Sequence, residues 1–266
     1  MKDQILSLLP ANHPWQDSVI WFDCIGSTND QAKLLAKQGA PHGTVLIAGR
    51  QTLGRGRLGR SFESPAGAGV YMSVILRPGC KPEELMHLTC ATAVAICNAV
   101  ENAAGFRPGI KWTNDLVWNG KKLGGILTEL SVSPLTGLVD YAIVGIGINC
   151  CQQTQDFSLQ LQNMAASLSM AANKAVAPQT LAAAMICALS AMDAVLLKEK
   201  SALMHCYCKD CITVDKDVVL VRGDEKRYGH ATGIAPDGGL IVRFDNGAVE
   251  TVQSGEISVR GMYGYV

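Results

Sequence analysis

The residues best suited to chemistry form a run rich in glycine and arginine, Gly54-Arg55-Gly56-Arg57-Leu58-Gly59-Arg60. Arginine presents a planar, permanently charged fork of donors that fits carboxylate and phosphate oxygens. The glycines let the backbone approach a ligand closely and adopt angles that other residues avoid. The run therefore predicts a loop that wraps a small anion. Taken alone, it fits a flexible solvated loop or a nucleic-acid-binding segment equally well.

A second segment places a lysine and an aspartate on the two arms of an expected hairpin. Asn119-Gly120 lies between two apolar runs, which is a strong signal for a type I′ turn. Asp115 precedes the turn and Lys122 follows it, so both could face one pocket. A lysine opposite an arginine-rich loop favours an anionic substrate, and the aspartate favours a metal ion or a cationic group. A solvated ion pair on the hairpin is the alternative.

Two further polar clusters are candidates for binding sites. Ser27-Thr28-Asn29 precedes an apolar helical pattern, so it predicts a helix N-cap, at which hydroxyls and amides can also hold a polar ligand. A simple cap is the plainer interpretation. The run from His205 to Cys211 contains three cysteines, but no second ligand pair follows it at zinc-site spacing. A packed helix end with buried thiols is therefore favoured over a metal site.

Apolar runs predict the elements that position these segments. The leading residues 1–17 read as a short helix and a loop. Strands are expected at 19–22, 45–48, 69–76 and 141–149, with helices at 83–104 and 179–198 and a polar loop containing one short turn over 150–178. The last of these strands is interrupted by Gly145 and Gly147. Glycine inside a strand often marks the close approach of a ligand or of another backbone.

The pattern changes near residue 213 to short strands separated by turn dipeptides. Five such strands are expected, at 218–221, 228–233, 240–244, 248–252 and 257–260. Strands of this length and spacing are typical of a small barrel. The sequence therefore predicts two domains, covering residues 1–212 and 213–266.

Composition narrows the classes of function. The 266 residues are 48% hydrophobic and carry a formal net charge of zero, so a folded core is expected and a general affinity for nucleic acid is not. The ten cysteines are scattered, and the N-terminal residues lack the layout of a signal peptide. We expect no apolar stretch to reach the roughly 18 residues that a membrane span needs. We expect a soluble, cytoplasmic protein with reduced thiols, no membrane partner and no nucleic acid partner.

Taken together and in order, the motifs resemble those of the biotin protein ligases. The resemblance is carried by Ser27-Thr28-Asn29, Gln51, the run 54–60, Lys111-Trp112-Thr113-Asn114-Asp115, Lys122 to Leu127 and Gly145 to Asn149, and it covers about residues 19–262. It implies an α+β fold: a mixed β-sheet catalytic domain packed with helices, of the biotin/lipoate protein ligase type, plus a small C-terminal SH3-like β-barrel.

The resemblance also implies a reaction and a set of site residues. Biotin would be activated with Mg-ATP as biotinyl-5′-AMP and then passed to a lysine of a biotin carboxyl carrier domain, belonging to a carboxylase or decarboxylase. The implied catalytic residues are Lys122, Arg57 and Asp115, with Asp115 also a possible contact to Mg²⁺. The implied biotin contacts are Ser27, Thr28, Asn29, Gln51, Gly54, Arg55, Arg57, Lys122, Gly145 and Gly147. The implied nucleotide contacts are Arg55, Arg57, Arg60, Phe62, Tyr71, Lys111, Asn114, Asp115 and Asn149.

Two positions depart from the family pattern. Thr113 stands where the family usually has proline, which presets the backbone, although threonine still permits an extended conformation. Phe62 stands where members often carry tryptophan near adenine, and it keeps an aromatic face. Few residues precede the first expected strand, so we expect no helix-turn-helix module and no DNA-binding repressor activity. The protein could be a monomer or a homodimer.

Two other functions remain open. A lipoate–protein ligase shares the fold and the adenylation chemistry, although the Arg-x-Arg run and the Ser-Thr-Asn set favour a polar ureido ring over a dithiolane. A non-catalytic module, such as a biotin sensor or an RNA-binding protein, could use the arginine loop for binding alone. The presence of Lys122 and Asp115 disfavours an inactive site, and the neutral net charge disfavours RNA.

Overall fold

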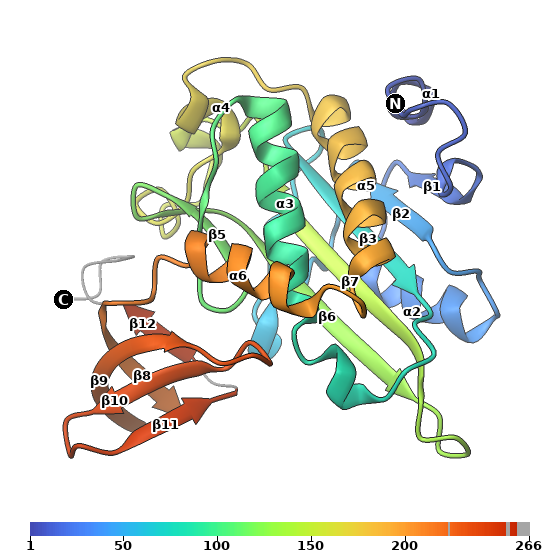
Figure 1. The fold of residues 1–266 in the computed structure, drawn as a ribbon. Helices are drawn as coiled ribbons and strands as arrows, with labels where there is room; N and C mark the ends of the chain where they lie inside the picture. Colours follow the sequence, from blue (N-terminus) through green and yellow to red (C-terminus); the bar gives the residue numbers. More distant parts are fainter. Residues whose placement is uncertain (223, 254–255, 260–266) are drawn as a thin grey trace.

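The computed structural model describes residues 1–222, 224–253 and 256–259, and its larger part is built on one mixed sheet (Figure 1). The sheet has seven strands in the order β1-β2-β3-β7-β6-β5-β4. Only its edge pair, β1 with β2, is parallel among the described strands. The strands are β1 (Val19–Phe22), β2 (Thr44–Ala48), β3 (Gly69–Leu76), β4 (Gly109–Lys111), β5 (Asp115–Trp118), β6 (Lys121–Val132) and β7 (Val139–Asn149).

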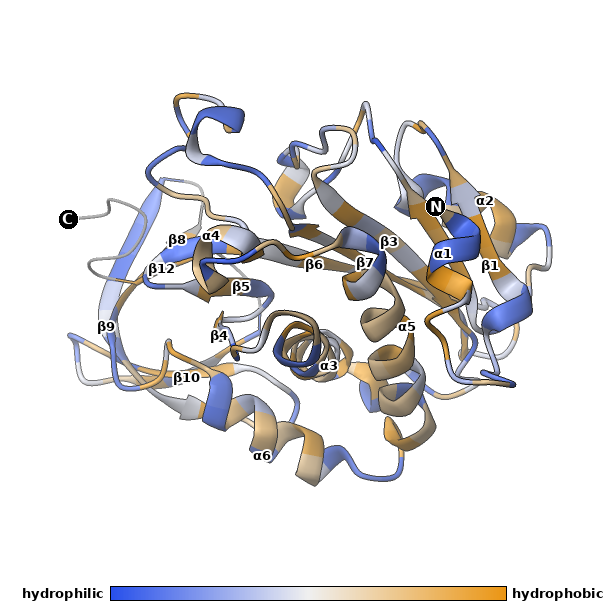
Figure 2. Ribbon diagram, turned by 90° about the horizontal axis from the view of Figure 1, so that it is seen from above, coloured by the Kyte–Doolittle hydropathy of each residue, from blue (hydrophilic) through white to orange (hydrophobic). Residues whose placement is uncertain are grey.

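Helices cover both faces of this sheet, which explains why its central strands are continuously apolar. The helices α3 (Leu88–Ala104) and α5 (Pro178–Val195) pack on one face, and α2 (Thr28–Lys37) packs on the other (Figures 1 and 2). Alternate residues of β2 enter the two cores: Val45 and Ile47 join the larger core, and Leu46 joins the smaller core beneath α2. The helix α6 (Lys200–Asp210) packs against α3.

The remaining helices are short. They are α1 (Lys2–Leu6) at the N-terminus and α4 (Leu168–Ala172), which Ser167 caps at its start. The four 3₁₀ turns are Gln16–Ser18, Arg57–Gly59, Pro82–Leu85 and Thr154–Asp156. The short helical turn expected at residues 165–170 is α4, which begins three residues later, and the loop also contains the 3₁₀ turn Thr154–Asp156.

The C-terminal residues form a separate five-stranded antiparallel sheet in the order β11-β10-β9-β8-β12. Its strands are β8 (Asp217–Arg222), β9 (Glu225–Ile234), β10 (Leu240–Phe244), β11 (Val249–Val252) and β12 (Glu256–Val259). Each predicted strand is present; Arg260, at the end of the last one, lies outside the described residues. The larger sheet with helices and this small antiparallel sheet confirm the predicted α+β architecture.

Three sequence predictions need correction. The helix expected over 83–104 is a 3₁₀ turn followed by α3, because the chain leaves the helical path at His87, a buried residue whose Nε2 lies 2.9 Å from the Leu196 carbonyl. The predicted helix end at Gly105 is confirmed, with the glycine in the left-handed conformation. Of the thiols expected to be buried at the end of α6, Cys211 is buried, whereas Cys206 and Cys208 are exposed.

The third correction concerns α5. This 18-residue helix is, by length and composition, the single described helix apolar enough to cross a membrane, contrary to the expectation that no such stretch exists. Its residues Leu181, Met185 and Leu189 are fully buried in the core shared with α3. This packing is that of a core helix, because the apolar residues already have protein partners.

Candidate active site

One cavity gathers most of the residues that the sequence singled out. It lies among the start of α2, the Gly/Arg loop 54–60, the β5–β6 hairpin and the middle of β7. Fourteen of the predicted site residues line it: Ser27, Thr28, Asn29, Gln51, Arg55, Arg57, Arg60, Phe62, Lys111, Asn114, Asp115, Lys122, Gly145 and Gly147. The other three, Gly54, Tyr71 and Asn149, do not line it.

The start of α2 forms a polar end of this cavity. Ser27 caps the helix by accepting a hydrogen bond from the Asp30 amide. Gln51 Oε1 accepts hydrogen bonds from the Thr28 amide at 2.8 Å and from Thr28 Oγ1 at 3.1 Å. Gln51 Nε2 donates to Ser64 Oγ at 3.0 Å, which fixes the orientation of the amide. The predicted cap is confirmed. Gln51 fixes the first residue of the helix, Thr28, by binding both its amide and its hydroxyl.

Asn29 is buried and supports this polar end from within the protein. Its Nδ2 donates to the Glu129 carboxylate at 2.9 Å and to the Leu127 carbonyl at 3.3 Å. Its Oδ1 accepts from Ser73 Oγ at 2.6 Å. A Cβ at Gly145 would overlap the Asn29 carboxamide, so the strand needs glycine there to make room for a side chain of this protein. Sequence reasoning missed Ser73, a fully buried hydroxyl in an otherwise apolar strand.

The β5–β6 hairpin delivers a lysine and an aspartate to the same cavity. Asn119 and Gly120 both have positive φ, which confirms the predicted type I′ turn. Lys122 Nζ lies 2.6 Å from Asp115 Oδ1. The Lys122 backbone is also held on both sides, by its amide donating to the Met164 carbonyl and its carbonyl accepting from the Ala166 amide. The ammonium group is therefore presented from a fixed backbone.

Backbone hydrogen bonds within the Gly/Arg loop fix its internal shape. The Gly56 amide donates to the Arg60 carbonyl at 2.7 Å, and the Phe62 amide donates to the Gly54 carbonyl at 2.9 Å. Gly54 lines a neighbouring hollow instead of the main cavity, and a Cβ there would overlap the Phe62 carbonyl. Its glycine is thus required by the shape of the loop.

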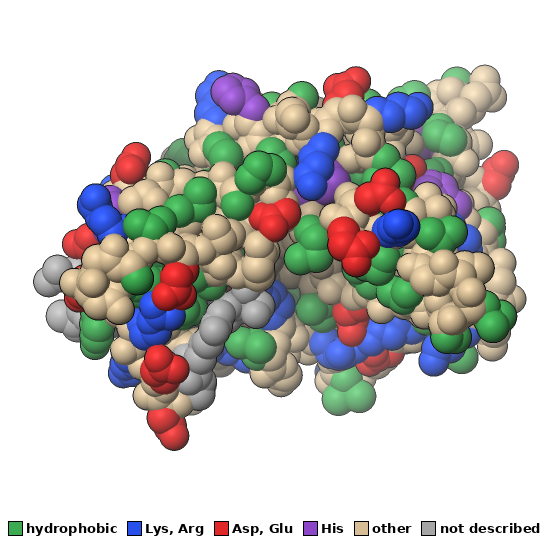
Figure 3. Space-filling model, turned by 60° about the horizontal axis from the view of Figure 1, so that its bottom comes forward, with side chains coloured by type: hydrophobic (Ala, Val, Ile, Leu, Met, Phe, Trp, Pro, Cys, Tyr) green, Lys and Arg blue, Asp and Glu red, His purple; other side chains and the backbone are tan. Residues whose placement is uncertain are grey.

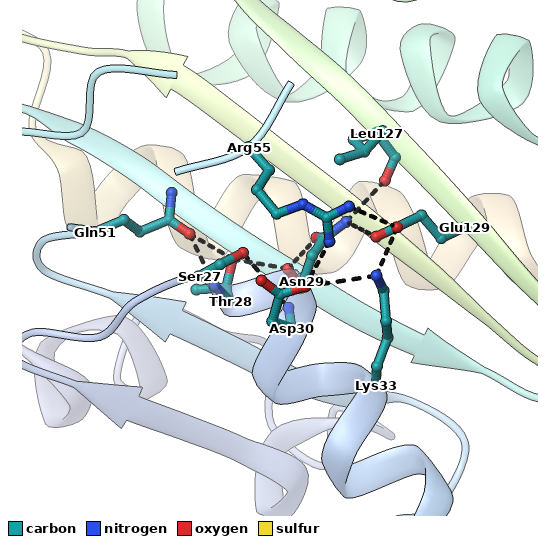
Figure 4. A network of polar contacts seen from close by, with 10 residues as sticks. Ser27, Thr28, Asn29, Asp30, Lys33, Gln51, Arg55, Leu127 and Glu129 are labelled. Atoms are coloured by element: carbon teal, nitrogen blue, oxygen red, sulfur yellow. Dashed lines mark hydrogen bonds and ion pairs between the residues drawn. The ribbon is translucent and has the colours of Figure 1, made fainter. Parts of the chain in front are cut away.

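The arginines of the loop have different partners. Arg57 Nη1 donates to Asn114 Oδ1 at 2.6 Å, and Asn114 is itself fixed by a bond from its Nδ2 to the Ile126 carbonyl. The Arg55 guanidinium forms ion pairs with Asp30 and Glu129 (Figure 4). Burial alone would lower the pKa of Arg55, but the charges and hydrogen bonds of these two carboxylates outweigh it and raise that pKa.

Phe62 and Tyr71 form an aromatic pair next to the Gly/Arg loop. The Phe62 ring lines the cavity and contacts Tyr71 in an edge arrangement, with 6.4 Å between ring centroids. Tyr71 is fully buried, and its hydroxyl donates to the Pro65 carbonyl at 3.0 Å. Burial raises the pKa of Tyr71 far above its usual range. Tyr71 thus packs behind Phe62 and does not line the cavity, and its contact with the nucleotide stays a prediction.

A second cavity adjoins the first and shares Arg60, Phe62, Lys111, Asp115 and Lys122 with it. The predicted residue Asn149 lies here, together with Gln152, Phe157, Leu161 and Met164. Gln152 Nε2 donates to Asn149 Oδ1 at 3.3 Å. Gln152 Oε1 is buried without a hydrogen-bond partner among the described residues. Sequence reasoning missed these four residues. For Phe157, Leu161 and Met164, the available signal was the presence of apolar side chains in a polar loop.

Figure 3 shows Lys and Arg side chains interspersed with Asp and Glu on the face it presents, without a continuous basic surface. No cluster of three or more His, Cys, Asp or Glu side chains suited to a metal occurs in the part of the chain that the structure describes. All ten cysteines are free thiols.

Comparison with family models gives two matches. Residues 21–149 match the biotin/lipoate A/B protein ligase family, and residues 213–260 match the biotin protein ligase C-terminal domain. Among curated relatives, the bifunctional ligase/repressor of Escherichia coli is 31% identical over 247 residues, which cover 91% of this chain and 74% of that protein. The bifunctional ligase/repressor of Bacillus subtilis is 44% identical over 158 residues, so the chain spans about half, 48%, of its length.

Solved structures give a similar result over nearly the whole chain. The biotin protein ligase from Aquifex aeolicus in complex with biotin and ATP is 28% identical, with a TM-score of 0.76. The alignment covers 91% of this chain and 98% of that chain.

Proposed function

Because the chain belongs to the biotin/lipoate A/B protein ligase family, we propose that it is an ATP-dependent biotin–protein ligase. In the first half-reaction the biotin carboxylate attacks the α-phosphorus of ATP, and pyrophosphate leaves. In the second, a lysine amine of a carrier domain attacks the acyl carbon of biotinyl-5′-AMP. AMP then leaves with the bonding electrons, and the amine loses a proton.

The observation that carries this proposal is the boundary between the two cavities. Lys122, Asp115, Arg60 and Phe62 line both, so a group bound in one cavity can react with a group bound in the other at this boundary. A cationic boundary between two sites suits a reaction in which a carboxylate and a phosphate must approach each other. Mutual repulsion of the two anions is the barrier that these side chains lower.

The polar end of the first cavity suits the ureido ring of biotin. A cyclic urea has one carbonyl acceptor and two N–H donors, and a mostly apolar pocket needs a few placed polar groups to fix it. Thr28, Gln51 and Ser27 lie together there with their hydrogen bonds mutually ordered. We place the ureido ring against this group, with the carboxylate pointing to Lys122.

At the boundary, the charged side chains would act on the developing acyl phosphate. The Lys122 ammonium and the Arg57 guanidinium are donors held by Asp115 and Asn114, respectively. Such preorganised donors stabilise negative charge without having to reorient during the reaction. After pyrophosphate leaves, Asp115 is the carboxylate placed to receive the incoming lysine ammonium and orient it.

The second cavity would hold the nucleoside of ATP. Phe62 and Phe157 offer aromatic faces, and Leu161 and Met164 add an apolar wall. Mg²⁺ is usually held by one or two carboxylates together with the substrate phosphates, and Asp115 fits such a role. The ion would neutralise part of the negative charge on the phosphates.

The partner, the location and the oligomeric state are part of the same proposal. We propose a biotin carboxyl carrier domain as the protein partner, a cytoplasmic location and a monomer or homodimer that acts without nucleic acid or a membrane. The absence of repressor activity is likewise an untested expectation for this chain.

Lipoate ligation is the second candidate, because the matched family includes lipoate ligases. The match of residues 213–260 to the biotin protein ligase C-terminal domain favours biotin. Exchange of labelled pyrophosphate into ATP, with biotin, lipoate and octanoate as parallel acids, separates the candidates. Exchange with biotin alone is expected. Exchange with lipoate instead would overturn the assignment of substrate, and binding of biotin without exchange would indicate a sensor.

A further inference from the structure

Arg55 joins the Gly/Arg loop to two separate elements of the catalytic domain (Figure 4). Its Nη1 lies 2.5 Å from Asp30 Oδ1, in the first turn of α2. Its Nη2 lies 3.2 Å from Glu129 Oε1, on β6. The loop is thus bound to α2, which forms the polar end of the first cavity, and to β6.

The same two carboxylates are held by groups outside the loop. Lys33 Nζ lies 2.6 Å from Glu129 Oε1 and 3.5 Å from Asp30 Oδ1. Glu129 Oε2 accepts from Asn29 Nδ2. Burial tends to raise the pKa of Glu129, but the hydrogen bonds from Lys33 and Asn29 and the charges of Lys33 and Arg55 outweigh it and lower that pKa. Glu129 is therefore a charged hydrogen-bond acceptor in a fixed position, which binds Asn29 of the pocket and Arg55 of the loop.

We propose that Asp30 and Glu129 are positioning residues: by binding Arg55 they keep the Gly/Arg loop closed over the first cavity and retain the acyl-adenylate between the two half-reactions. This rests on the proposed ligase function. A mixed anhydride must be kept from water and from stray amines until the acceptor lysine arrives. Arg55 thereby acts through the position of the loop, and Arg57, whose partner Asn114 lies across the cavity, is left to act on the ligand.

The solvent exposure of Arg55 sets how strongly its two ion pairs can favour the closed loop. The Arg55 side chain is 39% exposed, and an exposed ion pair contributes about 0.2–1 kcal/mol. Two such pairs correspond to a factor of about 2 to 30 in the open-to-closed ratio of the loop. The effect should also weaken with salt, because the charges are partly solvated.

The first experiment measures how fast biotinyl-5′-AMP dissociates from the preloaded full-length protein. Arg55→Gln should speed dissociation by about 2- to 30-fold, and Asp30→Asn and Glu129→Gln should each give part of this effect. Combining either with Arg55→Gln should add little, because the same contacts are already lost. Lys33→Gln is the matched comparison: it removes a cation from the same carboxylates but no contact to the loop, so the dissociation rate should rise less than in Arg55→Gln.

The second experiment does not depend on ligase activity. Hydrogen exchange of the amides of the loop and its flank, including the hydrogen-bonded amides of Gly56 and Phe62, should quicken more in Arg55→Gln than in Lys33→Gln. Equal effects of the two variants on dissociation and exchange would overturn the proposal, since they would indicate a general contribution to stability. Unchanged loop exchange in Arg55→Gln would overturn it as well. The wild-type protein could fail to form an adenylate while the two variants still differ in hydrogen exchange. That result would refute the ligase function but support the role of Asp30 and Glu129 in holding the loop.

Discussion

Replacing Gly147 with alanine tests how β7 shapes the boundary between the two cavities. An added Cβ would lie 2.7 Å from one carbon of the Phe62 ring and 3.0 Å from two others. Carbon atoms in contact prefer about 3.5–4.0 Å, so the ring must move by about 1 Å. Overpacking of this kind costs about 1–3 kcal/mol, which corresponds to an approximately 5- to 150-fold change in a binding constant. Because Phe62 lines the proposed nucleotide cavity, ATP binding should weaken by about that factor.

Gly145→Ala is the matched comparison, two residues earlier on the same face of the same strand. Its Cβ would overlap the Asn29 carboxamide, which is buried and cannot move without breaking bonds to Ser73 and Glu129. This variant should weaken biotin binding and lower the free energy of unfolding. The two glycines should therefore separate the two halves of the site.

The assay is isothermal titration of each ligand alone, with a melting curve for each variant. Gly147 and Phe62 also line the first cavity, so Gly147→Ala should weaken biotin binding to some extent and ATP binding more. Unchanged ATP affinity in Gly147→Ala would refute the reasoning, because it would mean that the ring is displaced without cost or lies away from the nucleotide. Equal losses of biotin affinity in both variants would refute the division of the site.

Three further predictions follow from the site and its surroundings. Lys122→Ala should lower biotin-dependent pyrophosphate exchange by about 10²- to 10³-fold, measured at saturating substrates, because a donor to the developing charge is lost. Gln152→Leu should weaken ATP binding by about 3- to 10-fold if its buried Oε1 accepts from the base, whereas Gln153→Leu, at an exposed position, should leave titrated affinity unchanged. The His42 ring joins two parts of the fold, because its Nδ1 accepts from the Arg77 amide at 2.9 Å and its Nε2 lies 2.8 Å from Asp193 Oδ2. Asp193→Ala should therefore lower the free energy of unfolding by about 0.5–1.5 kcal/mol, and an unchanged melting temperature would contradict this.

The features that sequence predicted are those with local causes. Ser27 caps α2 because a hydroxyl before a helical pattern can accept from the first turn. Asn119-Gly120 forms the hairpin turn because both positions accept positive φ. Apolar runs likewise predicted four strands of the larger sheet and the helical segments that contain α3 and α5.

The features that sequence missed depend on residues distant in the chain. Arg55 pairs with carboxylates 25 and 74 positions away, so neither Asp30 nor Glu129 could be assigned to it from spacing. Gly145 and Gly147 signalled a close approach, but the groups that approach are the side chains of Asn29 and Phe62. The second cavity was missed because residues 152–165 lack the periodicity of a helix or strand.

The contact between Trp112 and the C-terminal sheet has a consequence for the synthesis of the protein. The Trp112 amide donates to Thr213 Oγ1 and its Nε1 donates to the Gly238 carbonyl, 126 residues later. Trp112 lies in the first cavity between Lys111 and Asn114. A ribosome adding about 5–20 residues per second reaches Gly238 some 6–25 s after Trp112. During that interval the nascent chain lacks the groups that fix this wall, so a growing chain does not yet hold the finished cavity.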